Sequence, residues 1–339
     1  MRSPYSFIVF FLLLCSVCRA QQLEWDVSFH GFADNREYAK SGRYAQTIFG
    51  ARIAPEVGLA VDSIHRLKAG VNYLREFGTK NVGREFTPTV YYNYKKQGFN
   101  FYIGMFPRYG LLSDYPRAIL NDTLLYYRPN VEGMLLRYTN NVLFQQIWID
   151  WTSRQADTVP EQFMVGLSGK VRADLLYFAH HILLWHNALP KKKSANDHVQ
   201  DNGAASGRIG IDLSGYTFLD SLDVNAGAII GYDRLRDVYG WRISKGFITT
   251  LQATYRNFFL NNTFFTGQPL NIPYGDRFYT ARRYDRVEIG WTPLRYKGLE
   301  GTFTASFHFT PGAMDNQQQF SLRYRIGRSY PSPAGPKPR

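Results

Sequence analysis

Residues 299–310 read LEGTFTASFHFT, and this stretch decides the fold. From Leu299 to Phe309, every second position is apolar or glycine, whereas the positions between them, from Glu300 to Thr310, are polar. Successive side chains of a strand point to opposite faces. The stretch therefore predicts a β-strand with one apolar and one polar face.

The same alternation recurs along the chain and predicts an all-β protein of sixteen strands, with fourteen as the alternative count. The links between the strands alternate between short ones, rich in Asn, Asp and Gly as in hairpin turns, and longer ones. Short and long links therefore lie at opposite ends of an up-and-down antiparallel sheet. The predicted strands are residues 23–33, 47–61, 64–74, 87–95, 99–106, 131–139, 142–152, 163–171, 175–186, 207–218, 222–232, 241–255, 258–267, 284–293, 299–309 and 318–327.

The composition excludes several classes of protein. Aromatic residues make up 16% of the 339 residues, which is too many for a disordered chain. Cys15 and Cys18 are the only cysteines, and both precede residue 21, so the remainder supports neither a disulfide scaffold nor a cysteine-ligated metal. No later apolar stretch approaches the ~20 residues of a transmembrane helix.

The N-terminus has the pattern of a secretory signal peptide. Arg2 precedes an apolar run at residues 7–14, and Ala20 ends the segment at a site suited to cleavage. We expect a signal peptide at 1–20, a β-barrel at 21–327 and a short disordered, proline-rich tail at 328–339. An exported chain without apolar helices is either soluble or a closed membrane barrel.

Two features favour the transmembrane barrel over a soluble β-sandwich or propeller. Aromatic residues such as Tyr94, Phe99, Trp291 and Tyr296 gather at strand ends, as in the aromatic girdles of membrane barrels. Charged residues occupy mid-strand positions of the polar faces, which suits a water-filled lumen. We therefore predict a transmembrane β-barrel with short periplasmic turns and long external loops.

Residues 103–108 read IGMFPR and are followed by Asp114, Tyr115 and Pro116. With the strand pattern, these residues make the chain resemble porin-like outer-membrane β-barrels of Gram-negative bacteria, of the Bacteroidota type. The resemblance implies an outer-membrane location and passive diffusion of small hydrophilic solutes. Excess positive charge inside a narrow lumen would favour anions among them. It also implies that the link at 107–130, between the fifth and sixth strands, folds into the channel and narrows it.

The candidate pore-lining and constriction residues follow from this layout. Those in the long link are Arg108, Asp114, Arg117, Asp122 and Arg128, and those in strands are Asp150, Lys170, Asp212, Glu288, Arg323 and Arg325, with Arg52 as a further basic residue. Opposing basic and acidic rows would create a transverse field that selects solutes by charge. The alternative is that 107–130 is a surface loop with weak salt bridges.

The other expectations concern chemistry and partners. The formal net charge of +13 is spread over the chain without a nucleic-acid motif, so we expect no nucleic-acid partner. We expect contact with outer-membrane lipid and lipopolysaccharide, no cofactor, no metal and no enzymatic activity; a homotrimer is one open alternative. Two other functions stay open: a closed barrel acting as a binding or assembly platform, and a lipid hydrolase using His180, His181 or His186.

Overall fold

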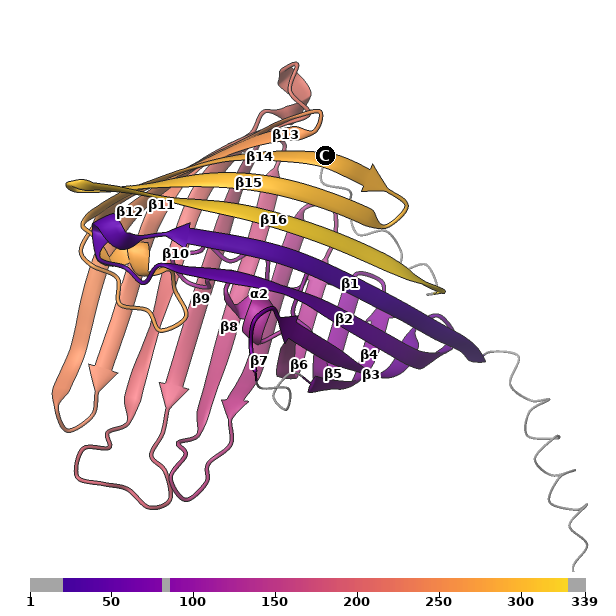
Figure 1. Cartoon of the computed structure of the whole chain (residues 1–339), viewed down its shortest axis with the longest axis horizontal. Helices are drawn as coiled ribbons and strands as arrows, with labels where there is room; N and C mark the ends of the chain where they lie inside the picture. Colours follow the sequence, from indigo (N-terminus) through magenta and orange to yellow (C-terminus); the bar gives the residue numbers. More distant parts are fainter. Residues whose placement is uncertain (1–20, 81–85, 329–339) are drawn as a thin grey trace, which may run out of the picture.

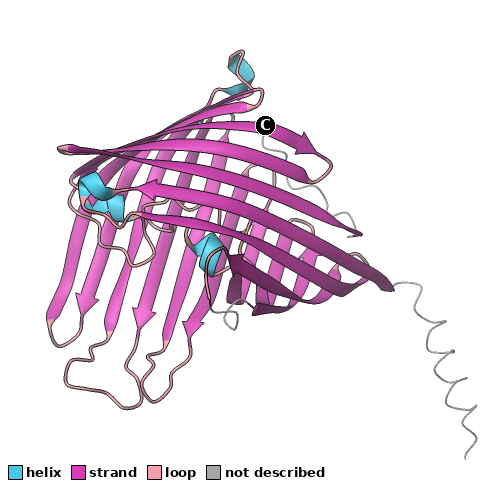
Figure 2. Ribbon diagram, in the orientation of Figure 1, coloured by secondary structure: helices cyan, strands magenta, loops and turns pink. Residues whose placement is uncertain are grey.

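The computed structural model describes residues 21–80 and 86–328. It shows a closed barrel of sixteen antiparallel strands, which confirms the predicted fold class and strand number (Figures 1 and 2). The predicted signal peptide and most of the predicted tail lie outside the described residues. Within those residues, no helix is both long and apolar enough to cross a membrane.

Strands occupy most of the described chain, and each pairs with the strands before and after it in sequence. β1 pairs with β16, and this contact closes the barrel. The strands are β1 Gln21–Glu37, β2 Gln46–Val61, β3 His65–Glu76, β4 Phe86–Lys96, β5 Phe99–Pro107, β6 Asn130–Thr139, β7 Leu143–Ser153, β8 Gln162–Ala173, β9 Leu176–Asn187, β10 Gln200–Asp212, β11 Ser221–Leu235, β12 Tyr239–Tyr255, β13 Phe258–Gly267, β14 Arg283–Tyr296, β15 Leu299–Thr310 and β16 Ala313–Arg328; the short helices are η1 Ala39–Ser41, α2 Leu124–Tyr127, η2 Ser214–Tyr216 and η3 Arg277–Thr280.

The short turns lie at the end of the barrel where β1 begins and β16 ends. The turn between β14 and β15 has two left-handed residues, Lys297 and Gly298, with φ angles of 41° and 81°. A side chain at Gly298 would place its Cβ 2.6 Å from the carbonyl oxygen of Arg325, so glycine is required there. In outer-membrane barrels the short turns face the periplasm, which assigns the opposite end to the cell exterior.

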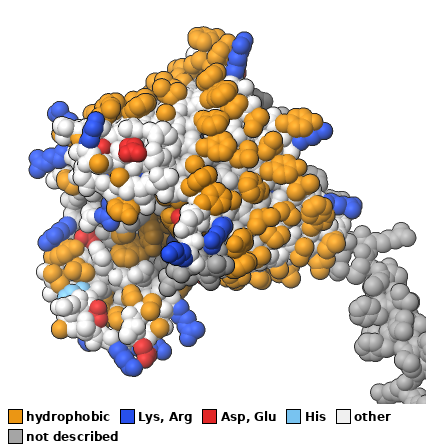
Figure 3. Space-filling view, in the orientation of Figure 1, with side chains coloured by type: hydrophobic (Ala, Val, Ile, Leu, Met, Phe, Trp, Pro, Cys, Tyr) orange, Lys and Arg blue, Asp and Glu red, His pale blue; other side chains and the backbone are white. Residues whose placement is uncertain are grey.

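The alternating pattern places apolar side chains outside and polar side chains inside. On β15, Phe303 faces outward and is 47% exposed, whereas Ser306 faces inward and is fully buried. Apolar side chains accordingly cover the outer wall of the barrel (Figure 3). This arrangement suits hydrocarbon outside the barrel.

Two of the predicted strands, β10 and β16, differ from the observed strands by five residues or more at one or both ends. β10 runs from Gln200 to Asp212 rather than over 207–218, because the small residues at 203–207 carry no apolar alternation. β16 begins at Ala313, so the expected long link at 310–317 is a hairpin turn at Pro311 and Gly312. Its external part contains Asp, Asn and Gln, so this segment lacks the apolar positions by which strands were recognised.

The lumen is partly filled by two external loops that fold inward. The first, residues 108–129, connects β5 to β6, and the second, residues 268–282, connects β13 to β14. Their buried residues include Leu112, Ile119 and Phe278, which form one apolar cluster with inward side chains of the wall such as Trp148. We call the two loops the plug. The plug therefore interrupts the water-filled lumen that the sequence predicts.

Candidate functional sites in the lumen and on the outer wall

Buried ion pairs fix the plug to the barrel and join its two loops. Arg108 pairs with Asp150 on β7, and both side chains are almost fully buried. Arg117 pairs with Asp122 in its own loop and lies 3.4 Å from Asp276 of the second loop. The backbone nitrogen of Asp276 also donates to the carbonyl oxygen of Arg117 at 2.9 Å. The two loops are thus one structural unit.

These contacts stabilise the charged forms of the loop residues. Burial alone raises the pKa of Asp122, but the neighbouring Arg117 guanidinium outweighs burial and holds the pKa below its usual value. Burial likewise acts to lower the pKa of Arg117, and Asp122 and Asp276 together raise it well above its usual value. Asp122 therefore stays ionised inside the plug.

Three cavities lie in the lumen of the described barrel. Cavity A, of 760 Å³, lies along β1–β4 and β16 and reaches the turn at Lys297. Cavity B, of 1620 Å³, lies along the opposite wall and reaches the turns at Asn141 and Gly215. Cavity C, of 490 Å³, lies on the external side of the plug near Tyr127. Cavities A and B therefore face the periplasm, and cavity C faces the exterior.

The structure distributes the predicted pore residues over different environments. Arg108, Asp150 and Arg128 hold the plug, with the Arg128 guanidinium donating to the carbonyl of Thr152 at 3.2 Å. Lys170, Asp212 and Glu288 line cavity B together with Asp114, Arg117 and Asp122, whereas Arg52, Arg323 and Arg325 line cavity A. The expected basic and acidic rows thus fall mainly in separate cavities. Their role in solute passage stays a prediction.

A serine, a histidine and an aspartate meet beside cavity B, which His181 and Asp114 line. Nδ1 of His181 lies 3.5 Å from Oγ of Ser206, and its Nε2 lies 3.7 Å from Oδ2 of Asp114. Burial raises the pKa of Asp114. The order of groups is that of a nucleophilic triad with long contacts. Cavity B opens to the periplasmic end, away from the outer leaflet.

A second histidine–carboxylate pair lies on the outer face of the wall. Nδ1 of His186 donates to Oδ1 of Asp201 at 2.7 Å. The guanidinium of Arg236, just beyond β11, donates to Asp201 at 2.9 Å. We call these three residues the outer-wall triad. Among the even-numbered positions of β9, Phe178 and Ile182 are exposed and His186 is half-buried, whereas His181 is buried, so the alternation places His186 on the outer face and His181 on the lumen face.

The outer-wall triad continues a row of aromatic rings across neighbouring strands. Trp151 on β7 stacks on Phe163 of β8 at 5.0 Å between centroids, and Phe163 contacts the His186 ring at 5.1 Å. The register pairs Trp151 with Phe163, Phe163 with His186, and His186 with Asp201. Outward aromatic rows mark the boundary between hydrocarbon and headgroups. The triad therefore lies at the external membrane interface.

Basic residues lie in the external loops above this row. The loop after β9 carries Lys191, Lys192 and Lys193, and its backbone bonds to the loop after β7, where the nitrogen of Lys191 donates to the carbonyl of Ala156 at 3.0 Å. Lys192 pairs with Asp157 at 2.7 Å in an exposed position. The two loops together carry a small excess of positive charge, because Asp157, Glu161 and Asp197 partly offset Arg154 and the three lysines.

The fold and the apolar outer wall define the class of this molecule as an outer-membrane β-barrel protein. The family model for Lipid A 3'-O-deacylase-type proteins matches residues 16–326, and the chain belongs to this family. No curated protein matches the sequence significantly.

Solved structures support the same fold. OmpT of Vibrio cholerae, in a loop L8 deletion mutant, superposes with a TM-score of 0.57 at 9% identity, covering 91% of this chain and 100% of that one. OccK11 (OpdR) of Pseudomonas aeruginosa gives 0.53 at 11% identity, covering 91% and 96%. OpdK of Pseudomonas aeruginosa, in a structure with vanillate, gives 0.51 at 10% identity, covering 91% and 99%. At such identities the likeness concerns the fold alone.

The family corrects one expectation from the sequence. The prediction of no enzymatic activity was wrong, because the family model is that of an enzyme family. The sequence alone offers His180, His181 and His186 without a partner, whereas the barrel register pairs His186 with Asp201, fifteen residues away. Asp276 and the second plug loop were also missed. In the described part of the chain, no group of three or more His, Cys, Asp or Glu residues could hold a metal.

Proposed function

We propose that the chain is an outer-membrane hydrolase that removes an ester-linked acyl chain from a lipid A-type glycolipid. The observation that carries this proposal is the 2.7 Å contact between His186 and Asp201 on the lipid-facing wall. A carboxylate that binds Nδ1 orients the imidazole and leaves Nε2 to accept a proton. His186 is thus arranged as a general base.

The reaction follows from this arrangement. Nε2 of His186 takes a proton from water as the water oxygen attacks the ester carbonyl carbon. The tetrahedral intermediate then collapses, the bond from that carbon to the alcohol oxygen breaks, and His186 returns the proton to the leaving alkoxide. The products are a free fatty acid and a glycolipid hydroxyl group. Asp201 stabilises the transient imidazolium without itself taking up a proton.

The location of the outer-wall triad suits a lipid substrate. Trp151 and Phe163 place His186 at the membrane interface, where the ester bonds between sugar headgroup and acyl chain lie. The side chain of Arg236 is 45% exposed and can bind a headgroup phosphate while it holds Asp201. The lysines of the loop after β9 add positive charge for an anionic glycolipid.

The lumen triad of Ser206, His181 and Asp114 is a second candidate centre for the same chemistry. Its three side chains are in the order that acyl transfer needs, with contacts of 3.5 and 3.7 Å. His181 is almost completely buried, and the cavity beside it faces the periplasm. An acyl chain in the outer leaflet does not reach it, so the outer-wall triad is favoured.

The two centres can be separated by matched variants in vesicles containing lipid A. His186→Ala should abolish release of fatty acid, whereas His181→Ala, one position away on the same strand, should retain it. If His181→Ala and Ser206→Ala were inactive and His186→Ala were active, the catalytic centre would be the lumen triad. Absence of release from the wild-type protein would reject the hydrolase.

Passive diffusion of small hydrophilic solutes is the second candidate function. The observation in its favour is that cavities A and C share Arg52, Asn72 and Pro129, so the two sides of the plug approach each other along this wall. The Arg52 guanidinium closes that approach by donating to the carbonyl of Leu125 at 2.8 Å. Single-channel conductance that is unchanged after deletion of residues 110–122 would remove the constriction hypothesis.

A further inference from the structure

Four ionisable residues form one row across neighbouring strands on the wall of cavity A. The register pairs Arg52 of β2 with His30 of β1, His30 with Arg323 of β16, and Arg323 with Glu300 of β15. Directly paired residues of neighbouring strands have Cβ atoms about 5 Å apart. All four residues line the cavity, so their side chains share one space.

The two arginines of this row lack carboxylate partners among the described residues. Arg52 donates to the main-chain carbonyls of Leu125 and Tyr126, and the Arg323 guanidinium lies 3.9 Å above the Tyr109 ring. Glu300 instead pairs with the exposed Arg295 at 3.6 Å. Two guanidinium groups thus flank His30 without an ion pair to neutralise them.

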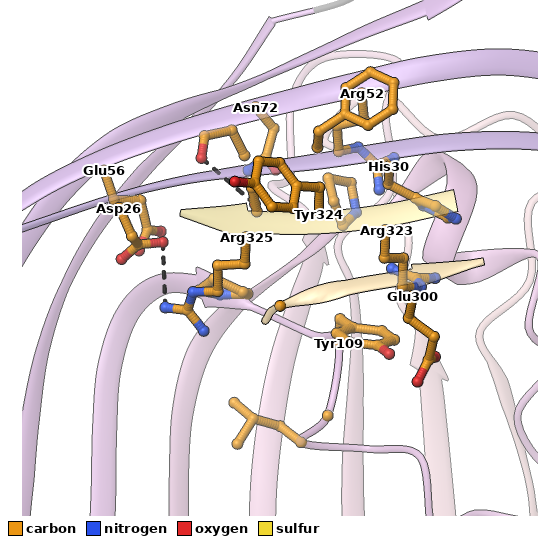
Figure 4. Close-up of a pocket in the computed structure, with 18 of the residues that line it drawn as sticks. Asp26, His30, Arg52, Glu56, Asn72, Tyr109, Glu300, Arg323, Tyr324 and Arg325 are labelled. Atoms are coloured by element: carbon orange, nitrogen blue, oxygen red, sulfur yellow. Dashed lines mark hydrogen bonds and ion pairs between the residues drawn. The ribbon is translucent and has the colours of Figure 1, made fainter. Parts of the chain in front are cut away.

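The opposite end of cavity A shows the contrasting arrangement. Arg325 lies 3.2 Å from Asp26, and Lys68 lies 3.0 Å from the same carboxylate. Figure 4 shows Asp26, Glu56 and Arg325 at one end and His30, Arg52 and Arg323 at the other. Arg325 and Lys68 thus have a carboxylate partner, in contrast to the two arginines beside His30.

Polar atoms without partners mark the same place. Nδ1 of His30 and Nε of Arg52 are buried and have no hydrogen-bond partner, and the two residues are only 6% and 8% exposed. The other ring nitrogen of His30 contacts Oγ of Ser321 at 3.1 Å. Buried polar groups are normally paired, so an unpaired group beside two cations indicates a missing partner.

We propose that this row is a binding site for a small oxyanion, a carboxylate or phosphate group, that enters cavity A from the periplasm. The guanidinium of Arg323 lies 3.9 Å over the Tyr109 ring, and a guanidinium can bind such a group through two parallel hydrogen bonds. Arg52 and His30 complete the site on β2 and β1, and Ser321 adds a hydroxyl. A cavity of 760 Å³ is within the range of small-molecule sites.

The site is independent of the proposed hydrolase. It lies inside the lumen and opens to the periplasm, whereas the outer-wall triad faces the lipid on β9 and β10. Substitutions in one site should leave the activity or binding of the other site unchanged. Rejection of one proposal would therefore leave the other proposal standing.

Calorimetric titration of the full-length barrel in detergent with inorganic phosphate and, separately, with acetate tests the site and distinguishes the two oxyanion classes. Arg323→Gln and Arg52→Gln should each weaken binding about tenfold, because each removes a charge-assisted hydrogen bond. The matched control is Arg325→Gln, on the same strand and face but paired with Asp26; it should bind as the wild type does. Absence of saturable binding to both anions, or equal weakening in the control, would overturn the proposal.

A measurement on the wild-type protein covers the case in which a variant does not fold. Phenylglyoxal modifies arginine side chains, and mass spectrometry identifies the modified residues. The oxyanion that binds should slow modification of Arg323 and leave that of Arg325 unchanged. Equal rates at Arg323 with and without both anions would exclude the site.

Discussion

His186 and Asp201 face each other directly on β9 and β10, and the nitrogen of one lies 2.7 Å from the oxygen of the other on the lipid-facing wall. The pair lies beside outward aromatic side chains such as Trp151 and Phe163. Removing two polar groups from water is costly unless each pairs with the other. The direct pairing offsets this cost and fits the role in acyl release proposed above.

Asp201→Asn should reduce the rate of acyl release by between about 100-fold and 10,000-fold, the range of a lost general base. The amide donates a hydrogen bond to Nδ1 and thereby selects the wrong imidazole tautomer. The substrate KM should change little, because Arg236 remains. Steady-state kinetics on lipid A vesicles measure both constants, and an unchanged kcat would contradict the assigned role of Asp201.

Replacing Lys191, Lys192 and Lys193 together by glutamine should raise the KM for an anionic glycolipid. These side chains lie in an external loop, so their attraction to phosphate is screened by salt. The wild-type KM should rise with salt concentration, and the KM of the variant should be high and nearly independent of salt. Arg256→Gln, in a periplasmic turn, is the control; the same effect in this control would show that the basic loop is not the binding surface.

Asp150→Ala should destabilise the barrel by about 3–5 kcal/mol, because it leaves the buried guanidinium of Arg108 without its partner. The unfolding midpoint in urea should fall accordingly, and gel migration of heated samples should report the same loss. The double variant Arg108→Met with Asp150→Leu should recover most of the stability. A single variant as stable as the wild type would show that the ion pair does not anchor the plug.

Acid should loosen the plug through Asp122. Its pKa is lower in the folded protein than in the unfolded chain, where it is about 3.9. The stabilising contribution of this carboxylate is therefore fully present above about pH 4 and is lost as the pH falls through the folded value.

Planar-bilayer recordings test this dependence. Conductance should stay constant from pH 7 to 5 and increase below about pH 4. Asp122→Asn should conduct more at neutral pH and lack the acid-dependent step attributed to this carboxylate. A variant with the same acid response as the wild type would assign the response to other groups.

The sequence predicts the barrel because a strand in contact with lipid on one face and polar groups on the other must alternate. The prediction fails where the alternation is absent. The start of β10 was missed because the residues before Gly207 are small, and the start of β16 was missed because its external part is polar. The site is less predictable. Asn121 and Tyr274 of the two plug loops meet across the lumen, and no periodic pattern links such distant loops.

The alternation of side chains along β9 correctly predicts that His180 and His186 face the opposite side of the wall from His181. The partner Asp201 follows only from the register between β9 and β10, which depends on the length of the intervening loop. Sequence reasoning therefore identifies the histidine but not Asp201, the carboxylate that binds it.

The most direct measurement is mass spectrometry of lipid A extracted from bacterial cells that express this barrel. The account predicts that wild-type protein converts lipid A to a species lighter by one acyl chain, that His181→Ala does the same, and that His186→Ala leaves lipid A intact. Intact lipid A in cells with correctly inserted wild-type protein, or full conversion by His186→Ala, would contradict it.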